Sequence, residues 1–398
     1  MNKKKYMIKS RKVEEFNLFS NFFLWKEFNK NFIIFILISM ISLSLCMIVK
    51  DEELVLDRCL KSCYKLFDEI VIVDTGSTDK TKEIAKKYTD NIFDFKWCDD
   101  FSLARNFAIE KCTKKYFMWL DADDIIRESE LKKLFNLKEN LDSSTDIVMI
   151  NYATSFDENN KPNFEYFRER IIKNNGKYKF SDPVHEAISP TGKIIFKDIT
   201  IEHRKIKENK KNRNLKIYEK LKKKTPLTPR QQFYYSRELY YNKKIDKALK
   251  NFLKFIKQKD GFYENKIDAC NILSKIYLEK NDFENAKQIL FRSFVYDLPR
   301  AEILCNLGYI YQEEKDYEKS VYYFLLAKEC EYKKFNLSFN KTEYYNFIPY
   351  IELCVGYYYL KDYQKSYYYN SLAKEIKPND EIILKNEQIL TKILEKII

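Results

Sequence analysis

One short stretch in the first third of the chain most constrains the fold: an apolar run that ends in three carboxylates. The five residues from Tyr116 to Leu120 predict a short buried β-strand. Asp121, Asp123 and Asp124 follow this run directly. Because strand residues two apart face the same side, we expect Asp121 and Asp123 to project together from the carboxyl end of the strand. In open α/β sheets, ligands bind at this end.

Two interpretations of this acidic cluster are open from the residues themselves. Paired hard oxygen ligands suit Mg²⁺ or Mn²⁺, with a substrate diphosphate completing the coordination shell. Alternatively, the carboxylates form a loop that caps a helix starting near Arg127, because Asp is favoured at helix N-termini. The surrounding sequence favours the first interpretation.

Apolar runs alternate with amphipathic segments on both sides of the cluster. Strands are predicted at 42–49, 69–74, 91–95 and 116–120, and helices at 52–63, 77–88 and 101–112. Near-continuous apolar strands separated by helices favour a parallel, doubly wound sheet. Right-handed crossovers would bring the carboxyl ends of these strands to one edge. Three further strands, at 147–152, 166–172 and 193–201, would complete a mixed sheet.

Polar residues follow each of the four predicted parallel strands. They are Lys50, Asp51 and Glu52, then DTGSTD at 74–79, then Trp97 with Asp99 and Asp100, and finally Asp121 with Asp123. Within DTGSTD, Gly76 permits a tight turn, and we expect Ser77 or Thr78 to cap the next helix. The sequence contains neither GxGxxG nor a P-loop lysine, so a diphosphate would be held by a metal ion and side chains.

The net charge of +13 is unevenly divided along the chain. Residues 1–39 carry eight basic and three acidic side chains (+5), and residues 204–224 carry 11 and two (+9). Residues 50–203 carry 25 basic and 30 acidic side chains, a net −5. A positive charge confined to a tail and one short segment does not predict a nucleic-acid groove, so we exclude a nucleic-acid partner.

The amino end contains an uncharged, mainly apolar run of 18 residues, Phe32 to Val49, behind a Lys-rich stretch. This arrangement is typical of a signal anchor. If 42–49 is a strand, however, only about ten residues remain, roughly 15 Å of helix and half a bilayer. We therefore expect no membrane span. The nine cysteines, with no CxxC spacing, indicate reduced thiols and a cytoplasmic protein, which could associate with the inner face of the membrane.

Four strings in order, SLCMIVKDEE, EIVIVDTGSTDKTKEIA, DDFSLARNFAI and WLDADD, resemble family 2 glycosyltransferases with the GT-A fold. The resemblance covers about residues 42–203. It is greatest to the branch with tetratricopeptide repeats, which includes bacterial peptide S-glycosyltransferases and surface-polysaccharide glucosyltransferases. It implies metal-dependent transfer of a sugar from a nucleotide-sugar, expected to be a UDP-sugar, to a peptide, protein or cell-surface glycan, with Mn²⁺ or Mg²⁺ as cofactor.

The resemblance also implies roles for individual residues. Asp74 would bind the nucleotide base, Asp121 the ribose and Asp123 the divalent ion. Arg105 would brace the nucleotide pocket, either by direct contact or by pairing with a pocket carboxylate. The full set of candidate substrate-binding residues is Lys50, Asp51, Glu52, Asp74, Ser77, Arg105, Asp121 and His185.

The chain has only two histidines, His185 in DPVHEA and His203 in TIEHRK. Glu186 stands where this family often keeps a general base, and it is our candidate catalytic residue. The Glu-Asp pair common in processive members is absent, so this assignment rests on position. His203 follows the strand at 193–201 and could join Asp123 on the ion. A structural role is the alternative for each histidine, and for His203 that role would be a cap of the following helix.

The second half of the chain repeats itself. Ala248, Ala286, Ser320 and Ser366 occupy one column, at spacings of 38, 34 and 46 residues, with Ile245, Phe283, Tyr317 and Tyr363 three residues before them. Small residues stand 12 positions before the last three of these, at Ser274, Gly308 and Cys354. Such a helix-pair period resembles tetratricopeptide repeats, which bind a protein partner or dimerise.

These patterns together predict an α/β GT-A domain with a Rossmann-like mixed sheet, followed by an all-α solenoid. We divide the chain into a basic, apolar extension (1–40), the catalytic domain (41–203), a basic linker helix (204–228) that runs away from the cleft, and helical repeats (229–398). Thr225–Pro229 marks the last boundary. The competing hypothesis is a tetratricopeptide scaffold whose first domain binds nucleotide but is inactive.

Overall fold

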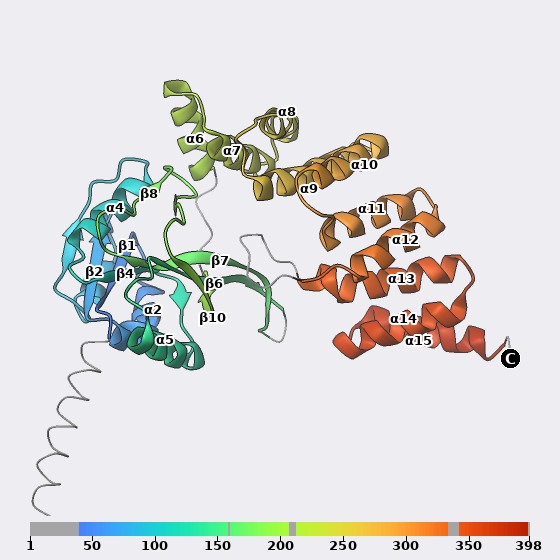
Figure 1. The fold of residues 1–398 in the computed structure, drawn as a ribbon, viewed down its shortest axis with the longest axis horizontal. Coiled ribbons are helices and arrows are strands. Elements are labelled where there is room, and N and C mark those ends of the chain that lie inside the picture. The colour runs from blue at the N-terminus through green and yellow to red at the C-terminus, as the bar shows by residue number, and fades with distance from the viewer. Residues whose placement is uncertain (1–39, 158–159, 207–211, 333–341, 397–398) are drawn as a thin grey trace, which may run out of the picture.

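The computed structural model describes residues 40–157, 160–206, 212–332 and 342–396, and Figure 1 shows its two parts. A sheet covered by helices forms the first part, and paired helices form the second. The prediction of an α/β domain followed by a helical solenoid is therefore confirmed. The expected extension before residue 40 lies outside the described residues. None of the helices among the described residues is long and apolar enough to cross a membrane.

The sheet has eight strands in the order β3-β2-β1-β4-β7-β6-β10-β5. Its parallel half consists of β1 (Leu43–Val49), β2 (Glu69–Asp74), β3 (Ile92–Asp94) and β4 (Tyr116–Trp119). The other half contains β5 (Asp124–Ile125), β6 (Ile147–Phe156), β7 (Pro162–Lys173) and β10 (Ile194–His203). Since β7 pairs antiparallel with both β4 and β6, the sheet is mixed, as predicted.

Helices cover both faces of the sheet, so the parallel strands are apolar throughout. On one face, Leu45 and Met47 of β1 pack with α2 (Leu56–Cys63) and α5 (Glu128–Asn140). On the other face, Cys46 packs with α4 (Phe101–Lys111). Successive strand residues point to opposite faces, which explains this division.

Two predicted helices are shorter than expected. The segment at 52–63 becomes helical only at Leu56, and the segment at 77–88 contains only α3 (Thr81–Ala85). Ser77 and Thr78 do not cap α3, which begins at Thr81 after Lys80. Their backbone N–H groups donate to Asp74 Oδ1 and Asp51 Oδ1, both at 2.8 Å. The polar residues after β1 and β2 therefore bind each other instead of starting a helix.

Two short strands, β8 (Phe180–Ser181) and β9 (Ala187–Ile188), precede the helical part. The helices are α6 (Arg213–Lys224), α7 (Pro229–Tyr241), α8 (Ile245–Ile256), α9 (Tyr263–Glu279), α10 (Phe283–Arg292), α11 (Ala301–Glu313), α12 (Tyr317–Lys328), α13 (Phe347–Tyr359), α14 (Tyr363–Ile376) and α15 (Glu381–Leu394). Short 3-10 turns lie at Tyr64–Leu66, Ser293–Val295 and Thr342–Tyr345.

The repeat pattern corresponds to helix pairs. The residues three before the small-residue column are the first residues of α8, α10, α12 and α14. The column itself, Ala248, Ala286, Ser320 and Ser366, is fully buried. A Cβ on Gly308 would lie 2.8 Å from the ring of Phe324, so this position requires glycine for the close approach of α11 and α12.

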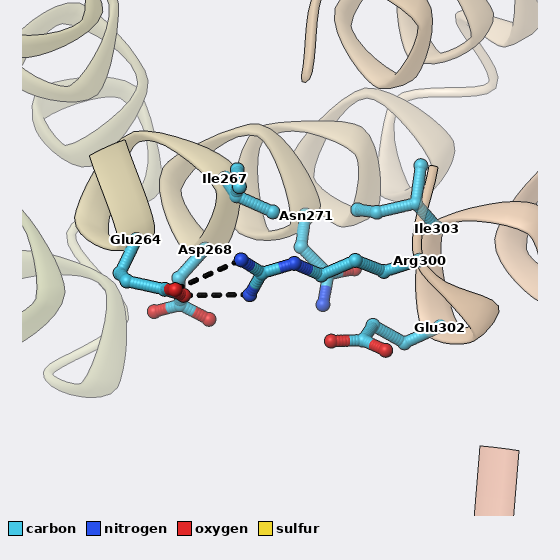
Figure 2. A pocket seen from close by; sticks show the side chains of 7 residues that line it. All are labelled: Glu264, Ile267, Asp268, Asn271, Arg300, Glu302 and Ile303. Carbon is cyan, nitrogen blue, oxygen red and sulfur yellow. Dashed lines mark hydrogen bonds and ion pairs between the residues drawn. The ribbon is translucent and has the colours of Figure 1, made fainter. Parts of the chain in front are cut away.

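Polar contacts also join successive repeats. Arg300, which precedes α11, donates to both carboxylate oxygens of Glu264 on α9, at 2.6 and 2.9 Å (Figure 2). Such two-point pairing fixes orientation as well as distance. The pairing therefore sets how α11 lies against α9.

The most deeply buried ion pair of the α/β domain joins β5 to β7. Asp124 and Arg170 have fully buried side chains, with 3.2 Å between Asp124 Oδ2 and Arg170 Nη1. Asp124 Oδ2 also accepts a hydrogen bond from the backbone N–H of Asp121 at 3.0 Å. This pair therefore fixes the turn that follows β4.

Replacing Asp124 with alanine should lower the free energy of unfolding by about 3–5 kcal/mol, because it leaves the Arg170 charge buried without a counter-ion. Urea unfolding monitored by circular dichroism measures this. Glu128→Ala, which breaks a surface ion pair with Lys132, is the matched control and should leave stability nearly unchanged. Equal stability of the two variants would contradict this role of Asp124.

Candidate functional site

A cavity of about 820 Å³ lies at the carboxyl ends of β1 and β4 and extends to the start of α6. The structure brings nine of the eleven candidate residues to its wall. They are Lys50, Asp51, Glu52, Arg105, Asp121, Asp123, His185, Glu186 and His203. The residues that we predicted at one edge of the sheet therefore line a single cavity.

The two remaining candidates, Asp74 and Ser77, lie beside this cavity without lining it. Asp74 is buried, and its Oδ1 accepts from the backbone N–H groups of Gly76 and Ser77 at 2.7 and 2.8 Å. Gly76 has φ +104°, which only glycine adopts readily. Within the described part of the chain, Asp74 Oδ2 is buried without a hydrogen-bond partner, so it could accept a bond from a ligand.

The segment after β1 is held by the segment after β2. Ser77 Oγ accepts from the backbone N–H of Asp51 at 2.9 Å, and Thr81 Oγ1 accepts from that of Glu52 at 2.7 Å. Asp51 has φ +53°. The Asp51 carboxylate accepts hydrogen bonds from Thr78, so it ties the loop that carries Lys50 to the segment after β2.

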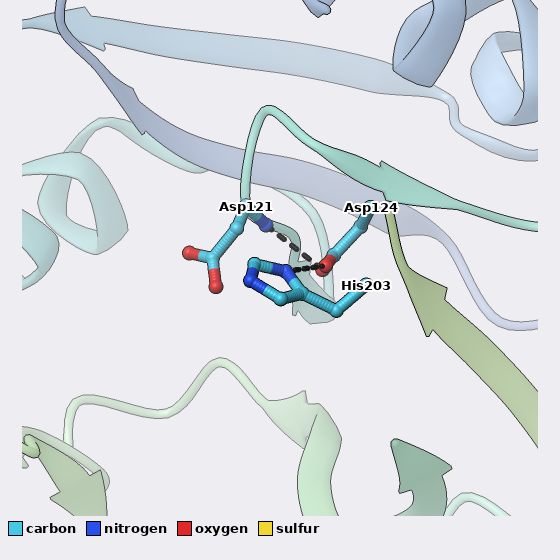
Figure 3. Close-up of side chains that lie close together, drawn as sticks. All are labelled: Asp121, Asp124 and His203. Atoms are coloured by element: carbon cyan, nitrogen blue, oxygen red, sulfur yellow. Dashed lines mark hydrogen bonds and ion pairs between the residues drawn. The ribbon is translucent and has the colours of Figure 1, made fainter. Parts of the chain in front are cut away.

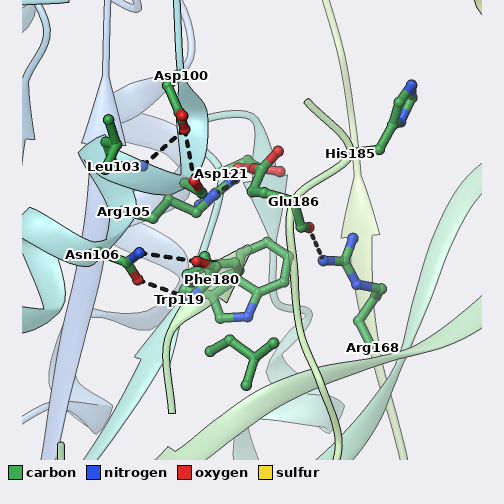
Figure 4. A network of polar contacts seen from close by, with 12 residues as sticks. Asp100, Leu103, Arg105, Asn106, Trp119, Asp121, Arg168, Phe180, His185 and Glu186 are labelled. Carbon is green, nitrogen blue, oxygen red and sulfur yellow. Dashed lines mark hydrogen bonds and ion pairs between the residues drawn. The ribbon is translucent and has the colours of Figure 1, made fainter. Parts of the chain in front are cut away.

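Arg105 on α4 joins two of the cavity's carboxylates. Its Nη2 donates to Asp121 Oδ1 at 2.6 Å, and its Nε donates to Glu186 Oε1 at 2.7 Å (Figure 4). Of the two expected arrangements for Arg105, the structure shows the pairing with pocket carboxylates. Burial alone would raise the pKa of Asp121, but the charges of Arg105 and Arg170 hold it well below its usual range.

The Arg105 guanidinium packs on the ring of a buried tryptophan, Trp119. The guanidinium carbon of Arg105 lies 4.7 Å from the centre of a Trp119 ring, and those of Arg168 and Arg170 lie at 4.8 and 3.7 Å. Trp119 also donates to the carbonyl of Glu169 at 2.5 Å. The Trp119 ring therefore stabilises the positions of all three arginines by cation–π attraction.

An acidic cluster with one imidazole lies at the end of β4 (Figure 3). Asp121, Asp124 and His203 each offer a ligand atom, all within 4.8 Å of one another. His203 Nδ1 also lies 3.2 Å from Asp123 Oδ1. Asp124 is fully buried and already engaged by Arg170, Tyr152 and His203, so Asp121, Asp123 and His203 are the residues that face the cavity.

The charge of His203 depends on its two acidic neighbours. Burial opposes the charged imidazolium, but hydrogen bonds with Asp123 and Asp124 raise the pKa of His203 to about 10. Without a metal ion, these two carboxylates therefore favour the protonated imidazole. A divalent ion at this position would compete with that proton. The carboxylate oxygens suit Mg²⁺ or Mn²⁺.

His185 connects the cavity to the helical part. Its Nε2 lies 2.9 Å from Glu238 Oε1 on α7, and its ring stacks on Tyr234 with 4.4 Å between centroids. His185 therefore lines the cavity while its polar edge is bound to α7. Position in the sequence alone gave no signal for this contact.

Several cavity residues were missed from the sequence. They are Tyr152, Thr154, Tyr166, Arg168, Lys205, Arg213 and Asn214. Arg213 and Asn214 are the first residues of α6, which begins at Arg213 and not at Arg204 as predicted, so the helix starts at the cavity wall. Leu215, Ile217 and Tyr218 of α6 are buried, so the apolar residues among its lysines were the signal that marked a packed helix.

The ion pair between Arg105 and Glu186 should be measurable by a double-mutant cycle of Arg105→Met and Glu186→Gln. We expect a coupling free energy of about 1–3 kcal/mol in urea unfolding, because the contact is direct and largely buried. The exposed pair of Lys220 and Asp99, replaced by Lys220→Met and Asp99→Asn, is the control and should show little coupling. Additive effects of the Arg105 and Glu186 substitutions would contradict the pairing.

Comparison with known proteins identifies the first part of the chain. Residues 44–204 match the family model described as glycosyl transferase family 2. A TPR repeat-containing protein of Synechococcus elongatus is 35% identical over 151 residues, which are 38% of this chain and 36% of that protein. The SPbeta prophage-derived glycosyltransferase SunS of Bacillus subtilis is 28% identical over 253 residues, 59% of this chain and 58% of that protein.

Other similarities cover different shares of the chain. The lipopolysaccharide core biosynthesis glycosyltransferase LpsC of Rhizobium meliloti is 29% identical over 201 residues, 44% of this chain and 70% of that protein. Among solved structures, YrrB, a TPR protein with an unusual peptide-binding site, aligns with 45% of this chain and 84% of its own, at 11% identity and a TM-score of 0.36. The chain spans little more than half the length of SunS, and about a third of the Synechococcus protein. The α/β part of this chain, residues 44–204, is a glycosyltransferase family 2 domain, and paired helices follow it.

Proposed function

We propose that this protein is a metal-dependent glycosyltransferase that transfers a sugar from a nucleotide-sugar, specifically a UDP-sugar, to a peptide, protein or cell-surface glycan. The observation that carries this proposal is the convergence of Asp121, Asp123, His203, Arg105 and Glu186 in one cavity of a family 2 domain. The cavity is large enough for a nucleotide-sugar, since ligand sites commonly measure about 300–1,000 Å³.

The donor would lie along the carboxyl ends of the parallel strands. Asp74 Oδ2 would be the acceptor for a base N–H that reaches past the cavity wall, because it has no hydrogen-bond partner within the described chain. Asp121 would accept from the ribose hydroxyls. Lys50, Arg168 and Arg213 add positive charge to the wall, which suits an anionic diphosphate. No glycine-rich loop is needed when side chains hold the phosphates.

Asp123 and His203 would hold the divalent ion, with Asp121 beside them. Asp124 would position His203 from behind, since its Oδ1 lies 3.2 Å from His203 Nδ1. When bound, Mn²⁺ or Mg²⁺ supplies neutralisation of the negative charge that develops on the departing diphosphate.

Glu186 is the carboxylate that would take the proton from the acceptor nucleophile in an inverting transfer. Arg105 orients it through Nε and binds Asp121 through Nη2, so the base and the ribose-binding carboxylate are set by one guanidinium. A change at Arg105 should therefore disturb donor binding and proton transfer together.

The comparisons and the helical repeats support different acceptors. The name of LpsC refers to lipopolysaccharide core biosynthesis, which supports a glycan acceptor, whereas the tetratricopeptide-type repeats favour a polypeptide. We prefer a polypeptide acceptor. The repeats would bind this acceptor, another protein or a second copy of the chain.

We place the reaction in the cytoplasm, where nucleotide-sugars are made. Residues 41–203 would be the catalytic unit, 204–228 the linker and 229–398 the repeats.

Asp123→Ala and His203→Ala should each weaken Mn²⁺-dependent binding of UDP by on the order of tenfold or more, because each removes a direct ligand of the ion. Isothermal titration calorimetry with and without Mn²⁺ measures this. Asp142→Ala, which removes an exposed carboxylate paired with Lys193, is the control. Unchanged UDP affinity in both cavity variants, or no effect of Mn²⁺ on the wild type, would contradict the metal site.

Glu186→Gln should lower kcat for sugar transfer by about 10²–10⁴-fold while UDP binding stays nearly normal, because the amide keeps the shape but cannot accept the proton. Steady-state kinetics with UDP-glucose and a cell-extract peptide fraction measure the transfer rate. The exposed Glu110→Gln on α4 is the matched control. If Glu186→Gln lost donor affinity and His203→Ala lost only turnover, the two roles would be reversed.

A further inference from the structure

The segment that carries Glu186 has an unusual backbone. Residues 182–186 connect β8 to β9, and two of them, Asp182 and His185, have φ of +73° and +55°. Residues with a Cβ are uncommon in this left-handed region, where the backbone is strained unless neighbouring contacts stabilise it. The conformation of the segment therefore depends on what binds it.

Helix α7 binds this segment at both of its strained residues. Arg230 Nε donates to Asp182 Oδ2 at 3.0 Å, and Arg230 Nη2 donates to the carbonyl oxygen of His185 at 2.8 Å. Gln231 Nε2 donates to Asp182 Oδ1 at 2.8 Å. One arginine thus spans the segment from its first residue to the residue before Glu186.

A second group of contacts holds the side chain of His185. Its ring lies against Tyr234, and its Nε2 pairs with Glu238 Oε1. The same Glu238 oxygen accepts from Asn214 Nδ2 at 3.1 Å. The Glu238 carboxylate on α7 therefore contacts both α6 and the segment 182–186.

The middle of the segment is part of the helical core. Val184 is 2% exposed and packs with residues of α6 and α7, including Phe233. Its carbonyl accepts from Tyr218 Oη at 3.1 Å. On the other side, the carbonyl of Pro183 accepts from the backbone N–H of Phe101 at 3.0 Å, at the start of α4.

The α/β domain holds the far end of the same segment. Arg105 binds the Glu186 carboxylate, and Arg168 Nη2 donates to the Glu186 carbonyl at 3.2 Å (Figure 4). Residues 182–186 are therefore bound on one side by the α/β domain and on the other by α6 and α7. Neither part alone supplies all of these contacts.

We propose that α7 is a structural component of the active site, in which Arg230 and Glu238 act as positioning residues that place Glu186 for catalysis. This inference rests on the proposed function. Arg230 lies outside residues 44–204 and does not line the cavity, so it acts only through the segment 182–186. A displacement of Glu186 by about 1 Å would cost on the order of 10² in rate, because proton transfer requires correct distance and orientation.

Arg230→Ala in the chain of residues 1–398 tests this inference directly. We expect kcat for transfer from UDP-glucose, measured as UDP release with Mn²⁺ present, to fall by about 10–10²-fold. We expect KM for UDP-glucose and the affinity for UDP to stay within about twofold, because the donor-binding carboxylates are not touched. Arg230→Lys keeps the charge and one contact, so it should recover part of the lost rate.

Lys220→Ala is the matched control, because it also breaks a contact between the helical part and the sheet domain, at Asp99, without touching residues 182–186. It should leave kcat unchanged. Glu238→Gln is the second positioning variant, and it keeps the proposal testable if Arg230→Ala does not fold. Hydrogen exchange of the amides at 184–186 should be faster in Arg230→Ala than in the wild type.

The outcomes separate this inference from the proposed function. An inactive wild type would reject the proposed function, and hydrogen exchange would then still show whether α7 holds the segment. An active wild type with unchanged kcat in both Arg230→Ala and Glu238→Gln would overturn the inference. A parallel loss of UDP affinity and of kcat in Arg230→Ala would also overturn it, since it would indicate general damage instead of a displaced Glu186.

Discussion

The candidate site depends on one buried guanidinium. Arg105 bonds Asp121 and Glu186 at 2.6 and 2.7 Å and lies on the ring of Trp119. Two carboxylates in a partly buried cavity would repel each other without a cation between them. Because the ring of Trp119 holds the Arg105 guanidinium in place, Arg105 also sets the orientation of the two carboxylates. The positions of Asp121, the candidate ribose-binding residue, and Glu186, the candidate base, therefore both depend on Arg105.

The fold supplies this cation and its partners from four distant parts of the chain. Arg105 comes from α4, its partner Asp121 from the end of β4, and its partner Glu186 from a segment bound by α7, while His203 joins the site from the end of β10. Parallel strands with right-handed crossovers bring the first two together. The segment with Glu186 requires the helical part as well, so the repeats contribute to the site in addition to any partner that they bind.

Much of the fold could be predicted because it follows from local periodicity. Apolar runs such as Tyr116–Leu120 and the small-residue column with Ala248 record burial directly in the sequence. The start of α3 and the partners of His185 and Arg213 could not be predicted, because they depend on contacts between residues far apart. Asp51 with Thr78 and His185 with Glu238 are two such contacts, at 27 and 53 residues' separation.

Intact-mass spectrometry of acceptors after incubation with UDP-sugars and Mn²⁺ tests the central claim most directly. The account predicts that a candidate peptide or glycan gains the mass of one transferred sugar, and that the gain requires the metal and both the α/β and helical parts of the chain. UDP binding by calorimetry without transfer to any acceptor, and without hydrolysis of the donor, would contradict it. That result would indicate a helical scaffold whose first domain binds nucleotide but is inactive.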